Sequence, residues 1–164
     1  MSDTSWLTQA AEKARRKADE AAAFEKARGT KHDERLQQFK KYFPSLWAEF
    51  GTIVRQRASV YNRARGAEMI SIEHPSDQTL VVMGKDGLGS CRCTIVVNPQ
   101  EASIGTQLST SLLHAGSSSS GGGPRIGIAL DEAGATFTSD GIKVETESAA
   151  DAVLRPAVDY LTVK

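Results

Sequence analysis

The sequence predicts an α+β fold in which an N-terminal helical region is followed by an antiparallel sheet and a C-terminal helix. Three observations support this. Apolar side chains recur at helical spacing over residues 31–65, alternate along the chain over 68–147, and return to helical spacing over 149–163. We therefore expect an N-terminal helical arm or hairpin at residues 1–29 and a single α+β domain at residues 30–164.

Composition is that of an ordinary globular chain. Of 164 residues, 40% are hydrophobic and 24% are charged, which is enough apolar material for one core. The first 16 residues contain no apolar run of signal-peptide length, and no window reaches the length of a membrane span. We expect a cytoplasmic protein with no membrane association. Two cysteines offer no disulfide framework.

The charge is unevenly distributed along the chain. Residues 1–66 contain 14 Lys/Arg and 8 Asp/Glu, whereas residues 67–164 contain 6 and 12. One interpretation is that a basic helical region lies on an acidic sheet domain, within one chain or between two. The other is a nucleic-acid-binding arm. Basic and acidic residues are interspersed along the helices, which argues against nucleic acid as a partner.

Residues 5–28 predict one helix with a narrow apolar seam. Alanine is a strong helix former that buries little area, so the seam is shallow. The helix either stands in solvent as an arm or forms a coiled-coil seam, and the pattern leaves both open. The seam residues recur at steps of three and four: Leu7, Ala11, Ala14, Ala18 and Ala21.

The segment Arg28-Gly29-Thr30 predicts a break between two helices. Gly29 suits the left-handed position after a helix end, and Thr30 suits the cap of the next helix. A helical hairpin is therefore expected.

Residues 31–65 carry the clearest periodicity in the chain. Pro44 lies opposite the apolar face and predicts a bend or a restart, and Gly66 ends the helix. Aromatic residues at this spacing are interpreted as core rather than as a binding groove, and Arg57 as pairing with an acid on the sheet or extending to the core edge. The apolar face comprises Leu36, Phe39, Phe43, Leu46, Trp47, Phe50, Ile53, Val54, Ala58, Tyr61 and Ala64.

The segment 68–147 predicts a meander of seven strands with one apolar face. Turn chemistry at Asp131–Gly134 and Asp140–Gly141 separates short alternating segments, so consecutive strands are expected to be antiparallel neighbours. The Ser/Gly-rich residues 115–123 predict a flexible loop. The expected strands are 68–74, 78–83, 90–97, 102–113, 125–130, 134–139 and 142–147.

The order of these elements resembles the pleckstrin-homology superfold and also a helix-grip fold. The resemblance rests on strands followed by a C-terminal helix, in which Ser148 and Asp151 form a capping pair and Pro156 predicts a kink. Element order does not determine function. The basic residues that a phosphoinositide-binding first hairpin would need are absent from residues 74–78.

Candidate chemistry is confined to Cys91, Cys93, His74 and His114. Cys91 and Cys93 fall on the apolar strand phase, where two core residues are the simplest interpretation. A zinc site would need two further ligands, for which His74 and His114 are the candidates. A nucleophilic cysteine would need an exposed thiol of low pKa. We predict no catalytic residue and no cofactor.

Three functional hypotheses follow. The first is a non-catalytic protein-interaction or assembly module that self-associates or binds a protein partner through its N-terminal helices. The second is a small apolar-ligand binding protein with a cavity between sheet and helix. The third is an enzyme, which would require the cysteines and histidines above to converge in a cleft.

Overall fold

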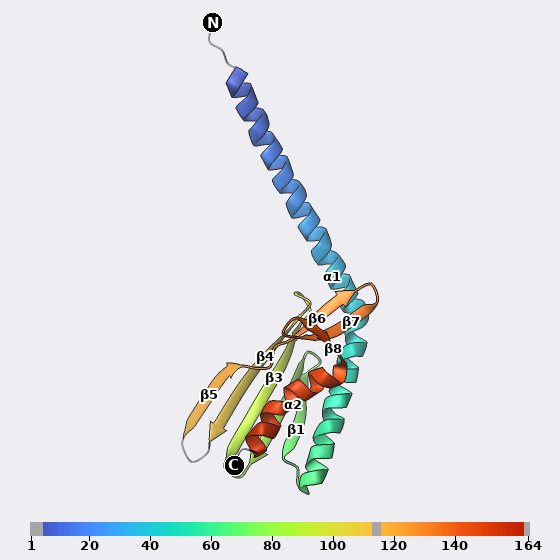
Figure 1. Ribbon diagram of the computed structural model, residues 1–164, viewed down its shortest axis with the longest axis vertical. Coiled ribbons are helices and arrows are strands. Elements are labelled where there is room, and N and C mark those ends of the chain that lie inside the picture. The colour runs from blue at the N-terminus through green and yellow to red at the C-terminus, as the bar shows by residue number, and fades with distance from the viewer. Residues whose placement is uncertain (1–4, 113–115, 163–164) are drawn as a thin grey trace.

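The computed structural model describes residues 5–112 and 116–162, and it confirms the α+β class. One long helix, α1 (Ser5–Arg65), precedes two antiparallel sheets of five and three strands, and α2 (Thr146–Thr162) ends the fold. Figure 1 shows the N-terminal half of α1 extending far from the sheets, and the C-terminal half lying against them. The helix changes direction where it reaches the sheets.

The larger sheet is a five-stranded meander in which each strand pairs with the next. It ends on one side at β1 and on the other at β5. Its strands are β1 (Ile70–Ser76), β2 (Thr79–Asp86), β3 (Gly89–Asn98), β4 (Ser103–Leu112) and β5 (Ser117–Gly122).

The smaller sheet contains β6 (Ile126–Asp131), β7 (Gly134–Ser139) and β8 (Ile142–Val144). Its turns form as predicted. The Asp131 carboxylate accepts hydrogen bonds from the backbone N–H groups of Ala133 and Gly134, and Asp140 and Gly141 both have positive φ.

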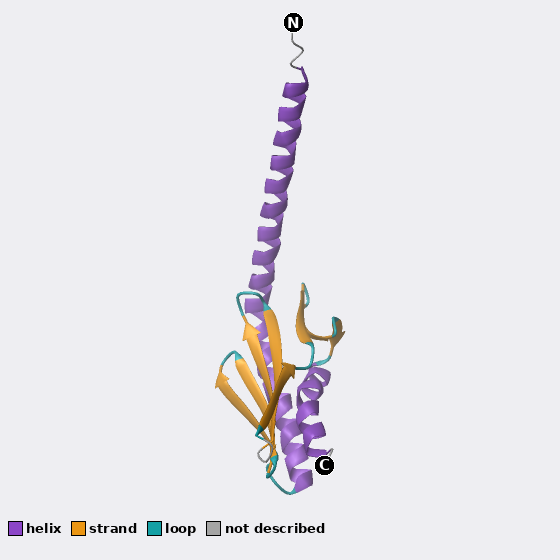
Figure 2. Ribbon diagram, turned by 90° about the vertical axis from the view of Figure 1, so that its left-hand side faces the viewer, coloured by secondary structure: helices purple, strands orange, loops and turns teal. Residues whose placement is uncertain are grey.

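Both helices lie on one side of the five-stranded sheet, contact the smaller sheet as well, and pack against each other (Figure 2). The predicted alternation is confirmed, because the apolar phase of the strands faces these helices. The layers approach closely at Gly84 of β2, where a Cβ would lie 3.0 Å from the Ala157 methyl of α2. Fully buried side chains fill the space between the layers: Phe50, Val54, Ile70, Leu80, Val82, Cys93, Ile95, Phe137 and Val153.

The apolar phase of the predicted strands also includes Leu112 and Ile142, but these two side chains lie in solvent. Leu112 is 42% exposed and Ile142 is 71% exposed. Leu112 ends β4, and Ile142 begins the three-residue strand β8 at the edge of its sheet, so neither lies in the middle of the layer that the helices cover.

The prediction of a single seven-stranded meander is wrong in strand number, because β5 forms within the Ser/Gly-rich segment. Residues 117–122 are a strand rather than a flexible loop. Strand pairing needs only backbone groups, and β5 pairs antiparallel with β4 from Ser117 to Gly122. The hydroxyl oxygens of Thr110 and Ser119 add a side-chain hydrogen bond at 2.6 Å.

The predicted helical hairpin is also wrong, because α1 is continuous through Gly29 and Thr30. The Thr30 hydroxyl donates to the carbonyl of Lys26 at 3.1 Å, so it bonds back to the preceding turn instead of capping a new helix. A glycine inside a helix costs only about 1 kcal/mol relative to alanine, which is too little to break a long helix. The helix likewise continues through Pro44 and ends at Arg65, before the left-handed Gly66.

Candidate functional site

A groove runs between α1 and the turn that joins β1 to β2. Its volume is about 830 Å³, which lies within the range of small-molecule sites. One wall is a face of α1 from Phe39 to Arg55. The opposite wall is the segment 74–78 together with Val97 and Pro99, where β3 ends.

The α1 wall of the groove contains part of a column of stacked aromatic rings, of which Phe39, Phe43 and Trp47 line the groove. Ring centroids are separated by 4.4 Å between Phe39 and Phe43, 5.7 Å between Phe43 and Trp47, and 5.5 Å between Trp47 and Phe50. The interpretation of this stripe as core is confirmed for the three phenylalanines, which are buried. Trp47 is half-buried and also lines the groove, a role that helical spacing alone does not distinguish from core.

The β1–β2 turn is attached to the helix by a hydrogen bond from the Trp47 indole. Its Nε1 donates to the backbone carbonyl of Asp77 at 3.0 Å. The bond holds the two walls of the groove at a fixed distance. It also means that the indole N–H is already used within the chain.

A β-bulge directs His74 toward the helix. The register between β1 and β2 shifts between Glu73 and Ser76, at the edge of the sheet where a proline such as Pro75 is tolerated. The imidazole then lies over Gly51, where a Cβ would stand 3.3 Å from its Cε1 atom. Its Nε2 lies 2.7 Å from Nη1 of Arg55.

The charges at this end of the groove are defined by the Arg55–His74 pair. Partial burial, and secondarily the Arg55 guanidinium, lower the pKa of His74 from its ordinary value of 6.5. The imidazole is therefore neutral at pH 7. Because arginine can only donate, Nε2 is the acceptor and Nδ1 carries the proton. Within the described part of the chain, neither Arg55 nor Lys40 forms an ion pair.

The cysteines lie elsewhere and have no feature of a nucleophile. Cys91 and Cys93 are buried on β3, under the helices. Burial raises the pKa of Cys91, and burial together with the neighbouring Cys91 raises the pKa of Cys93 to about 12. Strand β2 separates them from His74 on β1. His114 lies outside the described residues. Over residues 5–112 and 116–162, no group of three His, Cys, Asp or Glu side chains is placed to hold a metal ion.

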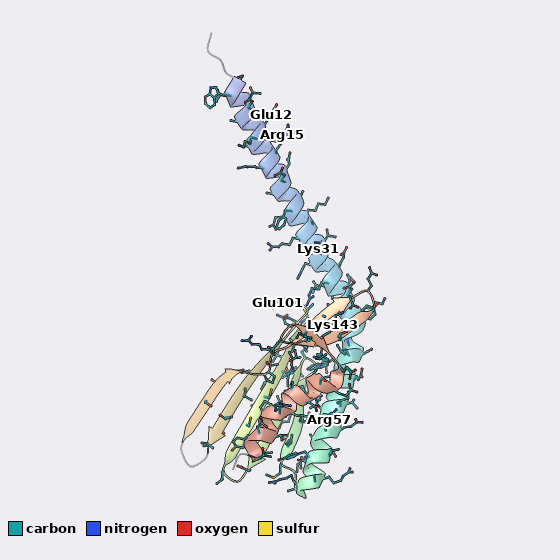
Figure 3. The ribbon with its side chains drawn as sticks, in the orientation of Figure 1. Glu12, Arg15, Lys31, Arg57, Glu101 and Lys143 are labelled. Carbon is teal, nitrogen blue, oxygen red and sulfur yellow. The ribbon has the colours of Figure 1, made fainter. Side chains whose placement is uncertain are left out.

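The second surface feature is the N-terminal half of α1. Every residue from Ser5 to Glu34 is exposed, and the aromatic side chains of Trp6 and Phe24 are 63% and 68% exposed. We call residues 5–34 the arm. Figure 3 shows Glu12, Arg15 and Lys31 distributed along it, away from the sheets.

The arm ends where the first side chain is anchored to the domain. Arg35 is half-buried, and its Nη2 donates to the carbonyls of Ala102 at 3.0 Å and Ile128 at 3.4 Å. At the other end of α1, Asn62 bonds the backbone of Met69 and Ile70. The sequence pattern does not reveal either role, because each depends on loops distant from the helix.

Arg57 pairs with an acid, but the acid is not on the sheet. Its Nη1 lies 3.1 Å from the carboxylate of Asp151 on α2, and both side chains are about half exposed. The pair joins the two helices at their solvent-facing edge. An exposed pair of this kind contributes little to stability, so Arg57 is a minor link between α1 and α2.

Comparison with known proteins identifies no relative: no family model, curated protein or solved structure matches this chain. Within residues 5–112 and 116–162, no helix combines the length and apolar character that crossing a bilayer requires.

Proposed function

We propose that this chain is a non-catalytic protein-interaction module whose arm docks against a helix of a partner protein. The observation that carries the proposal is the uninterrupted exposure of the arm. Its 30 residues extend for about 45 Å at 1.5 Å per residue. An isolated helix gains little stability in water, and helices in proteins are normally stabilised by packing one face.

The apolar seam of the arm continues the buried face of the same helix. Steps of three and four lead from Leu7 through the seam alanines, and after an interruption at Glu25 and His32 the same phase resumes at Phe39. In the domain this face packs against the sheets, whereas in the arm nothing within the described chain covers it. A partner helix would bury it.

The seam also indicates what kind of helix it would accept. Alanines at the contact positions allow close approach, so the partner supplies the larger apolar side chains. The positions directly beside the seam carry Arg15 and Lys17 and no acid. Basic flanks favour a partner whose own apolar stripe is bordered by Glu or Asp.

The test uses a synthetic peptide with leucine at its heptad contact positions and glutamate at the flanking positions. We expect it to bind the full chain, to gain helicity, and to shift the emission of Trp6, which is measured in a Trp47→Phe chain. Introducing two charges into the seam, by Ala14→Glu with Ala18→Glu, is expected to abolish binding. The matched control, Gln9→Glu with Ala23→Glu, adds the same charge on the opposite face and is expected to retain it.

Sedimentation of the natural chain, the Trp47→Phe chain and the two double variants shows which of them are monomers. If the natural chain self-associates and only the Ala14→Glu and Ala18→Glu variant is a monomer, the seam binds a second copy of the chain. The proposed partner with acidic flanks would then be wrong. A monomer that does not bind the peptide, or equal binding by both double variants, would reject the arm as a docking surface.

A further inference from the structure

We propose that the groove between α1 and the β1–β2 turn binds a small organic anion, with its charged group at Arg55 and a flat apolar body against Trp47. This proposal does not depend on the arm. The ligand site differs from the cavity between sheet and helix that the sequence led us to consider. Buried side chains fill the space between the layers, and the groove lies at the edge of that space.

The shape of the groove favours a flat apolar body. Its lining combines the half-buried indole of Trp47 with the rings of three prolines, which present rigid surfaces without hydrogen-bond donors. Because the indole is stacked between Phe43 and Phe50, a ligand meets it beside the stacked rings, where a flat apolar body can also pack against the proline rings. The three prolines come from separate elements, α1, β1 and the β3–β4 connection: Pro44, Pro75 and Pro99.

The polar groups at the ends of the groove favour negative charge. Arg55 uses one N–H on His74, and its remaining donors form no further hydrogen bond recorded in the described chain. The neutral His74 accepts from Arg55 through Nε2 and adds no charge of its own. Lys40 contributes a second positive charge to the lining, against one carboxylate, that of Asp77.

The distance between the two cations decides where the anionic group binds. Lys40 and Arg55 are 15 residues apart on one helix, or about 22 Å along its axis. A small ligand therefore contacts only one of them through its charged group. The Arg55 end is the better site because a planar guanidinium binds carboxylate or sulfonate through two parallel hydrogen bonds, whereas the Lys40 ammonium is a point charge without this geometry.

The groove is also preorganised, which reduces the entropy lost on binding. The hydrogen bond from Trp47 to Asp77 attaches the turn to the helix, and the hydrogen bond between Arg55 and His74 joins the helix to β1. Because both walls are held by contacts within the chain, the ligand does not need to order them.

The probe for the test is 8-anilinonaphthalene-1-sulfonate, a flat aromatic anion that fluoresces in apolar sites. Its uncharged counterpart, N-phenyl-1-naphthylamine, has the same ring system. A full-length chain carrying Trp6→Phe leaves Trp47 as the single tryptophan. Energy transfer from Trp47 then reports a probe bound to the domain, and the variants below assign its position to the groove.

We expect saturable binding of the anion with energy transfer from Trp47. Arg55→Gln is expected to weaken it about tenfold or more, the value of one hydrogen bond to a charged group. Ala48→Leu, which fills the groove without changing charge, is expected to weaken both probes. Ala48 and Arg55 are exposed, so neither change removes a core residue. Arg63→Gln makes the same charge change on α1 outside the groove and is expected to have no effect.

Three results would overturn the proposal. They are the absence of energy transfer from Trp47, equal affinity for the charged and uncharged probes, and an affinity for the anion that neither Arg55→Gln nor Ala48→Leu alters. Circular dichroism of each variant confirms that the helix and strand content is retained, so a loss of binding is attributed to the groove.

Discussion

The Asn62 side chain connects the end of α1 to the first strand. Its Oδ1 accepts from the backbone N–H groups of Met69 and Ile70, and its Nδ2 donates to the Ile70 carbonyl at 2.7 Å. These three bonds satisfy backbone groups at the point where the chain turns from helix to sheet. The geometry explains why a short connection can reverse the chain here.

We expect Asn62→Ala to lower the free energy of unfolding by about 2–3 kcal/mol, because each lost hydrogen bond is worth about 1 kcal/mol. Urea denaturation followed by circular dichroism measures the change. Gln56→Ala, at an exposed position of the same helix, serves as the control and is expected to have almost no effect. Equal stability of the two variants would show that water replaces the Asn62 bonds.

His74 makes stability depend weakly on pH. Its pKa is lowered below 6.5 in the folded chain, so as the pH falls the unfolded chain takes up a proton first. The stabilising contribution is complete above pH 6.5 and is lost as the pH falls through the folded-state pKa. The effect is small because the side chain is largely in solvent.

We expect the stability difference between pH 7.5 and pH 5.5 to be smaller in His74→Gln than in the natural chain. Urea denaturation of both proteins at the two pH values measures it, and the other titrating groups cancel in the comparison. The opposite sign, with the natural chain less affected by acid, would contradict the assignment of Nε2 as an acceptor from Arg55.

Helix α1 contains Gly29 in its interior, although glycine is more common just after the end of a helix. Gly29 is helical, its φ is not positive, and a Cβ there would meet nothing within 4 Å. A left-handed Gly29, as a hairpin would require, would resist substitution, whereas a helical one should accept alanine.

Gly29→Ala is therefore expected to stabilise the middle of α1 by about 1 kcal/mol. Amide hydrogen exchange of residues 25–34 measures this as slower exchange. Ala22→Gly is the reciprocal control and is expected to accelerate exchange in its own turn. Faster exchange in Gly29→Ala would mean that the helix breaks at this position.

The same element shows which parts of the fold were predictable. The face containing Phe39, Phe50 and Val54 was predictable because burial imposes a helical period on many residues at once. The ends of the helix were harder to predict. Gly29-Thr30 resembles a helix boundary locally, but whether the helix continues depends on the free energy of the whole helix. Strand β5 was missed because serine and glycine carry no strand pattern, and its pairing to β4 depends on backbone groups.

The groove was predictable only in part. Helical spacing placed Trp47 on the correct face of α1, but the opposite wall depends on the bulge at His74-Pro75 and on long-range contact. Arg55 lies off the apolar face, so no periodicity marks it. His74 was singled out as a possible metal ligand, whereas the structure places its imidazole against Arg55.

At the scale of the whole molecule, the arm and the domain share one helix but not one core. No residue from Ser5 to Glu34 is buried, and the first anchored side chain is Arg35. The stability of the domain should therefore be independent of the arm, because removing exposed residues removes little apolar area from the folded state.

We expect a chain beginning at Arg35 to unfold at the same temperature as the full chain. A chain beginning at Lys40 lacks both Arg35 and the buried Phe39 and is expected to unfold at a clearly lower temperature. Calorimetry of the three proteins measures this. A lower melting temperature for the chain beginning at Arg35 would show that the arm contacts the domain.

The continuity of α1 also has a mechanical consequence. The helix bends where it reaches the sheets but is not interrupted by a loop, so a molecule that grips its free end applies leverage to the aromatic rings stacked at the other end. Twisting or tilting the helix would displace Trp47 and Phe43 relative to the β1–β2 turn. A force on the arm would therefore be transmitted to the wall of the groove, because no flexible linker separates the two.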